Sequence, residues 1–68
     1  MTPETMAEEL RGLTGAADVE VSEYPINECP EDVFVRDIRL RGSRHIVTFP
    51  SAGLYDRLEH FAAWVSAR

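Results

Sequence analysis

The stretch VFVRDIRLRGSRHIVTF, residues 33–49, decides the fold because it contains two alternating segments that a short turn can join. In each segment, apolar and polar side chains alternate with the period of a β-strand that buries one face. Gly42-Ser43 separates the segments, and glycine at the first central position is typical of a type II′ turn. The sequence therefore predicts a β-hairpin whose two-residue loop is Gly42-Ser43.

This turn implies a register that the hydrophobic pattern can check. The expected cross-strand pairs are Arg41 with Arg44, Leu40 with His45, Ile38 with Val47, and Arg36 with Phe49. One face then carries the apolar side chains Phe34, Ile38, Leu40, Val47 and Phe49, with Arg36 as the exception. A slip of one residue would turn one strand's apolar side chains away from the core, so both strands agree on the buried face.

Two amphipathic helices are expected on either side of the strands. The first spans residues 3–14, with Thr2 as its N-cap, Pro3 in its first turn and Gly15 as its C-terminal stop. The second follows Ser51, which is the expected N-cap. The apolar stripes expected on the two helices are Met6, Leu10 and Leu13, and Leu54, Leu58, Phe61 and Val65.

The remaining alternating segment, DVEVSEY at residues 18–24, predicts a third strand, and the proline-rich residues 25–32 predict a loop. The order is α-β-β-β-α. A chain of 68 residues is long enough for one small domain. We therefore expect a single α+β domain over residues 1–68, a three-stranded antiparallel meander with both helices on one face.

The composition restricts the partners and the compartment. Twelve acidic residues against seven arginines give a formal net charge of −5, which disfavours binding to nucleic acid or to an anionic membrane. The single cysteine, Cys29, excludes an internal disulfide and fits a reducing cytosol. The first segment, MTPETMAEELRG, lacks the basic start and apolar run of a secretory signal. We expect a cytoplasmic protein that does not enter a membrane.

No pattern indicates catalysis. The chain contains no glycine-rich phosphate loop, no nucleophile motif and no metal-ligand spacing. Acidic neighbours disfavour a thiolate at Cys29. His45 falls on the core face as a packing residue, and His60 lies on the second helix. We expect neither an enzyme nor a cofactor or metal site.

Two groups of residues are candidates for partner binding: the arginines Arg39, Arg41 and Arg44 near the hairpin turn, and the aromatic residues Tyr55 and Trp64 of the second helix. The arginines either balance nearby carboxylates across the sheet or form a patch that faces an anionic partner. The aromatic residues either cover the edge of the core or serve as exposed anchors.

These features favour a small acidic protein–protein interaction module, acting as an inhibitor or adaptor. Phage or mobile-element inhibitors of DNA-handling or defence complexes are one such class by size and charge. One alternative is a nucleic-acid contact through the arginine hairpin, and another is a homodimer whose exposed sheet face or edge strand is the interface. Double-stranded RNA-binding domains share the element order, but they carry a basic cluster at the start of the second helix. This chain has SAGLYD there, with no basic residue before Arg57.

Overall fold

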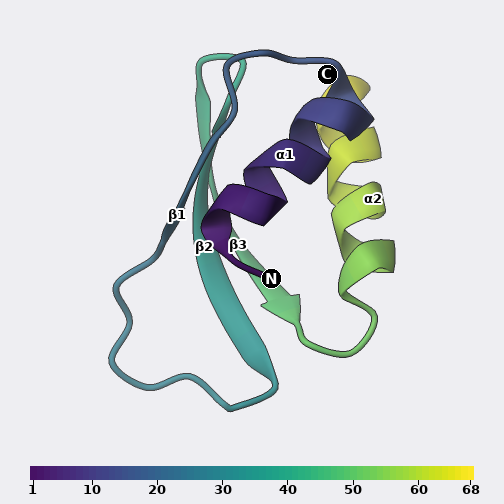
Figure 1. Cartoon of the computed structure of the whole chain (residues 1–68). Helices are drawn as coiled ribbons and strands as arrows, with labels where there is room; N and C mark the ends of the chain where they lie inside the picture. Colours follow the sequence, from purple (N-terminus) through teal and green to yellow (C-terminus); the bar gives the residue numbers. More distant parts are fainter.

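The structure, a computed structural model, covers all 68 residues and has the expected order of elements. These are α1 (Pro3–Thr14), β1 (Glu20–Glu23), β2 (Val33–Leu40), β3 (Ser43–Pro50) and α2 (Leu54–Ser66). The strands form one antiparallel sheet in the order β1-β2-β3. Both helices lie side by side on the same face of this sheet (Figure 1). The expected fold class and architecture are therefore confirmed.

The core lies between the sheet and the two helices. From the hairpin, Ile38, Leu40 and Phe49 are fully buried, while Phe34 and Val47 pack against the core with partial exposure. The predicted buried face of the hairpin is therefore correct. From the helices and the segment before β1, the core receives Met6, Ala7, Leu10, Val19, Leu54, Leu58, Ala62 and Val65.

The first helix begins and ends as its sequence indicates, but its buried stripe differs. The Thr2 hydroxyl accepts a hydrogen bond from the Thr5 amide, and Gly15 closes the helix with a left-handed φ of 73°. Ala7 is buried, whereas Leu13 is exposed. The expectation for Leu13 was wrong because α1 packs on both β1 and α2, which turns the centre of its buried face toward Ala7. Leu13 is left at the margin, in the last turn.

Ser51 is not the N-cap of the second helix, contrary to the sequence-based expectation. Its backbone N–H donates to the Asp32 carbonyl at 2.6 Å, which continues the hairpin pairing one step beyond Pro50. The helix starts at Leu54 after Gly53, whose φ of 72° turns the chain and whose lack of a side chain leaves the cap without a hydrogen bond. Ser51 extends the sheet and is therefore not free to cap the helix.

The hairpin turn and its register also differ from the prediction. Leu40 pairs with Ser43, so the two central residues are Arg41 and Gly42, with φ of 52° and 79°. Positive φ at both positions defines a type I′ turn, whose twist matches that of the strands. The observed pairs are Ile38 with His45, Arg36 with Val47, and Phe34 with Phe49.

In the observed register, each residue of β2 pairs with a residue of β3 two positions earlier than expected. Because this shift is an even number of residues, side chains that face inward stay inward and the buried face is preserved. The observed register places Phe34 opposite Phe49, with ring centroids 6.1 Å apart. The expected register would have lost this pairing of two aromatic side chains. Cross-strand aromatic contact therefore favours the turn at Arg41-Gly42.

The register can be tested by NMR. Non-hydrogen-bonded pairs of an antiparallel ladder bring their α-carbons within about 4.5 Å, so their α-protons give strong cross-strand NOEs. We expect such NOEs between Arg39 and Arg44 and between Asp37 and Ile46. Strong NOEs between the α-protons of Leu40 and His45 would instead support a turn at Gly42-Ser43.

The core can be tested by truncation. Leu58 is 1% exposed on α2, so Leu58→Ala should lower the free energy of unfolding by about 2–5 kcal/mol. A domain this small has only a few kcal/mol of stability, so the variant should be largely unfolded. The control is Glu59→Ala, at the exposed neighbouring position, which should unfold like the parent in urea as followed by circular dichroism. Equal unfolding midpoints for all three proteins would contradict this packing.

Candidate functional site

The structure brings two of the three candidate arginines together on the open face of the sheet. Arg39 of β2 lies directly opposite Arg44 of β3. Like charges in this position repel, but Asp37 accepts hydrogen bonds from Arg44 Nε and Nη2, the shortest at 2.8 Å. The hydrogen bond from Arg44 holds the pKa of the Asp37 carboxyl below its ordinary value of 3.8, and it raises the pKa of Arg44.

Arg41 does not join this pair. It occupies the hairpin turn and donates from Nη2 to the carbonyl of Thr14, at the end of α1, over 3.0 Å. Arg39 faces Glu20 across the β1–β2 ladder. The structure therefore divides the cluster into an ion pair, a tether between the turn and α1, and one arginine beside a carboxylate. Only the Arg44–Asp37 contact is an ion pair, so a carboxylate balances the charge of Arg44 alone.

The Arg44–Asp37 ion pair predicts that the stability of the fold depends on pH. The pKa of Asp37 is lower in the folded protein than in the unfolded chain. The carboxylate therefore stabilises the fold at pH values above its unfolded pKa, and this stabilisation is lost as the pH falls through its folded pKa. By NMR, the Asp37 carboxyl should titrate below 3.8 in the parent and at higher pH in Arg44→Gln. Titration at the same pH in both proteins would contradict the ion pair.

Arg36 is the one charged residue on the buried face, and its exposure is 7%. Its Nη2 donates to the Met1 carbonyl at 3.2 Å, and its guanidinium lies 4.6 Å from the centre of the Phe34 ring. These contacts hold the start of the chain against the sheet and cover the charge with an aromatic face. We therefore assign Arg36 a structural role.

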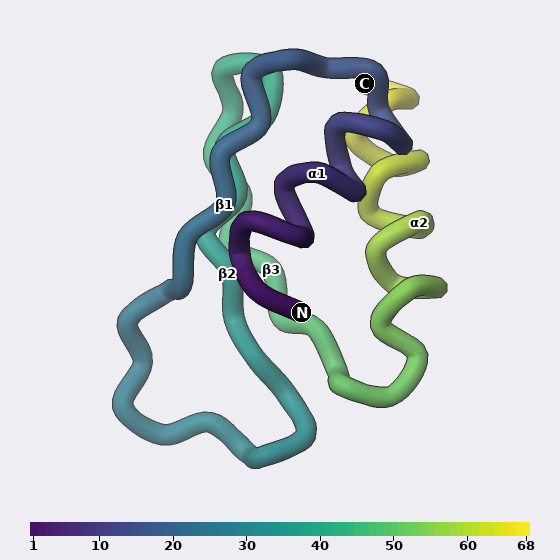
Figure 2. Tube along the Cα trace, in the orientation of Figure 1, coloured from purple at the N-terminus to yellow at the C-terminus, as the bar shows by residue number.

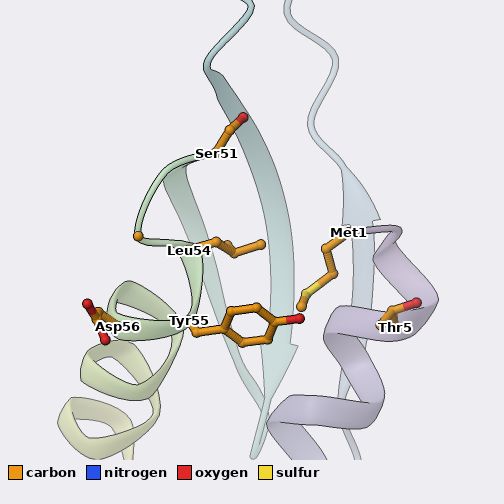
Figure 3. A pocket seen from close by; sticks show the side chains of 7 residues that line it. Met1, Thr5, Ser51, Leu54, Tyr55 and Asp56 are labelled. Atoms are coloured by element: carbon orange, nitrogen blue, oxygen red, sulfur yellow. The ribbon is translucent and has the colours of Figure 1, made fainter.

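One cavity lies between the N-terminal ends of the two helices. It measures about 540 Å³ and includes Met1, Thr5, Leu54, Tyr55 and Asp56. Figure 3 shows the Tyr55 ring reaching across it toward the Met1 side chain, whereas Asp56 points away. The lining contains no cationic side chain, cysteine or histidine. It therefore offers neither a nucleophile with its base nor a side chain that would neutralise an anion.

The second cavity is a groove between β3 and α2, with a volume of about 350 Å³. Trp64 lines this groove and is 46% exposed. Its ring stacks with Phe61 at 6.3 Å and meets His45 edge-on at 5.7 Å. The lining residues are Val47, Thr48, Phe49, Arg57, His60, Phe61 and Trp64. We call this cavity the β3–α2 groove.

The two aromatic candidates therefore belong to different places. Tyr55 and Trp64 are nine residues apart on α2, which puts them on opposite sides of the helix and about 13 Å apart along it. Only Trp64 lies in the β3–α2 groove, and its position is supported by Arg68, whose guanidinium carbon lies 3.9 Å from the ring centre. His45 is half-buried on the core face, as expected.

The groove runs beside an unpaired sheet edge. The pair Leu40–Ser43 closes a two-residue hairpin, so these two residues are hydrogen-bonded to each other. Along an antiparallel ladder, hydrogen-bonded pairs alternate with pairs that are not hydrogen-bonded. The amides and carbonyls of Arg44, Ile46 and Thr48 therefore point away from β2. The sheet order leaves this edge of β3 without a neighbouring strand. The free edge thus presents three donors and three acceptors, and one of the three residues that carry them, Thr48, also lines the aromatic groove.

Sequence reasoning identified Trp64 and named an edge strand as one alternative interface, but it predicted neither the groove nor which strand has the free edge. Arg57 was named only as the first basic residue of the second helix, His60 was placed on that helix, and Ile46 was not singled out. The alternation of RHIVTF indicates which residues point outward, but not which strand lies at the edge beside α2. That information depends on how α2 crosses the sheet.

Comparisons of the chain with protein-family models, with curated proteins and with solved structures found no match. Neither helix has the length and apolar character needed to cross a membrane. The fold and its geometry define a small α+β domain in which an open strand edge adjoins an aromatic groove.

Proposed function

We propose that this protein is a protein–protein interaction module, an inhibitor or adaptor that binds an extended segment of a partner along the free edge of β3. The observation that carries the proposal is the groove beside that edge. In strand addition, main-chain hydrogen bonds supply affinity and adjacent pockets select alternate side chains. The outward amides and carbonyls of Arg44, Ile46 and Thr48 supply the first requirement, and the groove under Trp64 supplies the second.

The composition of the site supports a protein partner. Tryptophan, tyrosine and arginine dominate the energetics of protein interfaces, and the groove has Trp64 and Arg57 on its wall. Edge strands normally carry protection such as proline, bulges or inward-pointing charges. Along β3, proline occurs only at the last residue, Pro50, and Ile46 at its centre is 47% exposed. A partner strand would cover both Ile46 and the unpaired backbone groups.

The nucleic-acid alternative has less support. Arg44 is paired with Asp37, Arg41 is bonded to the end of α1, and Arg39 faces Glu20. Two of the three arginines are therefore engaged within the fold, and the net charge of −5 opposes phosphate. A cytoplasmic location fits the lone, exposed thiol of Cys29.

Selection from a displayed library of random peptides tests the proposal. We expect the parent to select peptides that bind with measurable affinity. Trp64→Ala should weaken this binding at least tenfold because it removes the groove wall. Tyr55→Ala is the matched control, since it truncates a more exposed aromatic residue of the same helix outside the groove. Loss of binding in Tyr55→Ala but not in Trp64→Ala would assign binding to the other flank of α2.

A second pair of variants tests the role of the strand edge. Ile46→Pro removes an outward N–H that β2 does not use, and proline is tolerated at such positions of edge strands. Ile46→Thr removes the same apolar side chain but keeps the N–H. Ile46→Pro should therefore keep its circular dichroism spectrum and lose peptide binding, whereas Ile46→Thr should retain most of it. Equal binding by both variants would exclude strand addition.

A further inference from the structure

The second helix covers the inner side of the free edge of β3. Of the three strands, α2 packs mainly on β3, whereas α1 packs mainly on β1. The ring centroid of Phe61 on α2 lies 6.4 Å from that of Phe49 and 5.4 Å from that of His45, so Phe61 sits over inward-facing side chains of β3. Trp64 lines the groove and is partly exposed. A strand added to β3 would therefore place its inward side chains in the groove, beside α2.

The position of α2 limits what can occupy the edge. Neighbouring strands lie about 4.8 Å apart, whereas the axes of packed helices need about 8–10 Å. In two-fold antiparallel pairing of β3 with its copy, both α2 helices would lie on the same side of the joined sheet. Because each α2 packs on its own β3, the two axes would come closer than helix packing allows. The edge therefore fits a segment that carries no helix over its inner side, and not a second copy of the chain.

The two elements that border the groove carry no net charge. Together β3 and α2 contain two arginines and two carboxylates, which are Arg44, Arg57, Asp56 and Glu59. Arg44 is already paired with Asp37, and the two carboxylates of α2 border a surface depression together with His60. Figure 2 shows that the acidic loop after β1 extends away from α2, so it adds no charge beside the groove. Neither sign of charge is therefore favoured in an occupant.

The groove suits one bulky apolar side chain. It measures about 350 Å³, and its hydrophobic lining residues are Val47, Phe49, Phe61 and Trp64. In an added antiparallel strand, the residue opposite Val47 turns its side chain toward the groove, and its two neighbours turn toward the open face beside Ile46 and Thr48. A charged side chain opposite Val47 would lose its hydration against two aromatic rings. The inward position therefore selects for apolar bulk.

We infer that the partner segment is an uncharged extended tail or linker that places one bulky apolar side chain, such as leucine or phenylalanine, opposite Val47. The inference rests on the proposed function and names the chemistry of the partner. A surface without net charge complements a segment without charge, and the residue opposite the exposed Ile46 covers it on the open face. A tail or linker carries no helix of its own, so it can lie beside α2.

Four peptides of strand length test the inference, each fused as a tail to a soluble carrier protein. The first is a run of threonines with a central leucine, and the second has alanine in place of the leucine. The other two keep the leucine and carry glutamate or lysine at both positions beside it. By isothermal titration calorimetry at physiological salt, alanine should weaken binding about tenfold or more, because the groove loses its apolar occupant. Glutamate and lysine should each change the affinity less than about threefold, because exposed charges are screened.

Two variants of the protein locate the effect. In Trp64→Ala, the preference for the leucine peptide over the alanine peptide should largely disappear, since this double-mutant cycle isolates the contact between the leucine and the Trp64 ring. Tyr55→Ala truncates an aromatic residue of the same helix outside the groove and should keep the preference. A preference that is the same in Trp64→Ala as in the parent would overturn the inference.

The remaining outcomes separate the two proposals. If the leucine and alanine peptides bind equally, or if the glutamate and lysine peptides differ about tenfold or more, β3 accepts a strand but the inference is wrong. If no peptide binds and none is selected from the random library, the proposed function itself fails. Sedimentation equilibrium should show a monomer. A stable dimer that Ile46→Pro dissociates would overturn the inference in favour of a second copy.

Discussion

The pairing of β2 with β3 is the constraint on which the rest of this structure depends. It places Ile38, Leu40 and Phe49 on one face, and together these fully buried side chains form the floor of the core. Burying that face requires a covering layer, and a chain of 68 residues has only two short helices to supply it. Both helices are therefore used on one side, and the other side of the sheet stays open to solvent (Figure 1).

One-sided covering also explains the site. A meander of three strands has two edges, and neither helix pairs with the backbone of β3. Packing of α2 across the core brings Phe61 and Trp64 beside that strand, where they meet His45. The aromatic residues complete a small core on one side and form a groove wall on the other. The same contacts that stabilise the domain therefore shape the surface that we propose as its binding site.

Charged residues are unevenly distributed over this protein. The acidic residues are concentrated in the part of the chain that forms α1, β1 and the following loop, so the overall charge of −5 does not describe the groove. The hairpin arginines, which are the most conspicuous feature of the sequence, are largely engaged within the fold. The less conspicuous Arg57 and Arg68 are without carboxylate partners and lie at the groove. Local pairing therefore matters more here than the number of arginines in a stretch.

The sequence by itself determined the order of elements, the buried face of the hairpin and the limits of the first helix. Each depends on local periodicity or on one capping residue, such as Thr2 or Gly15, and these act over a few neighbouring positions. The sequence also identified Trp64 as a candidate anchor, without assigning it a location. The tertiary structure decided the turn at Arg41-Gly42, because the pairing of Phe34 with Phe49 lies far along the ladder.

The tertiary structure likewise decided the start of the second helix and the position of the groove. Ser51 has the side chain of a cap, but its backbone completes the sheet by bonding to Asp32, a contact between residues distant in sequence. Trp64 and Tyr55 look equivalent along one helix, yet packing places only Trp64 beside an open strand. Local pattern determined which residues turn inward, whereas long-range contacts determined which outward groups lie together, because only packing brings separate elements into one surface.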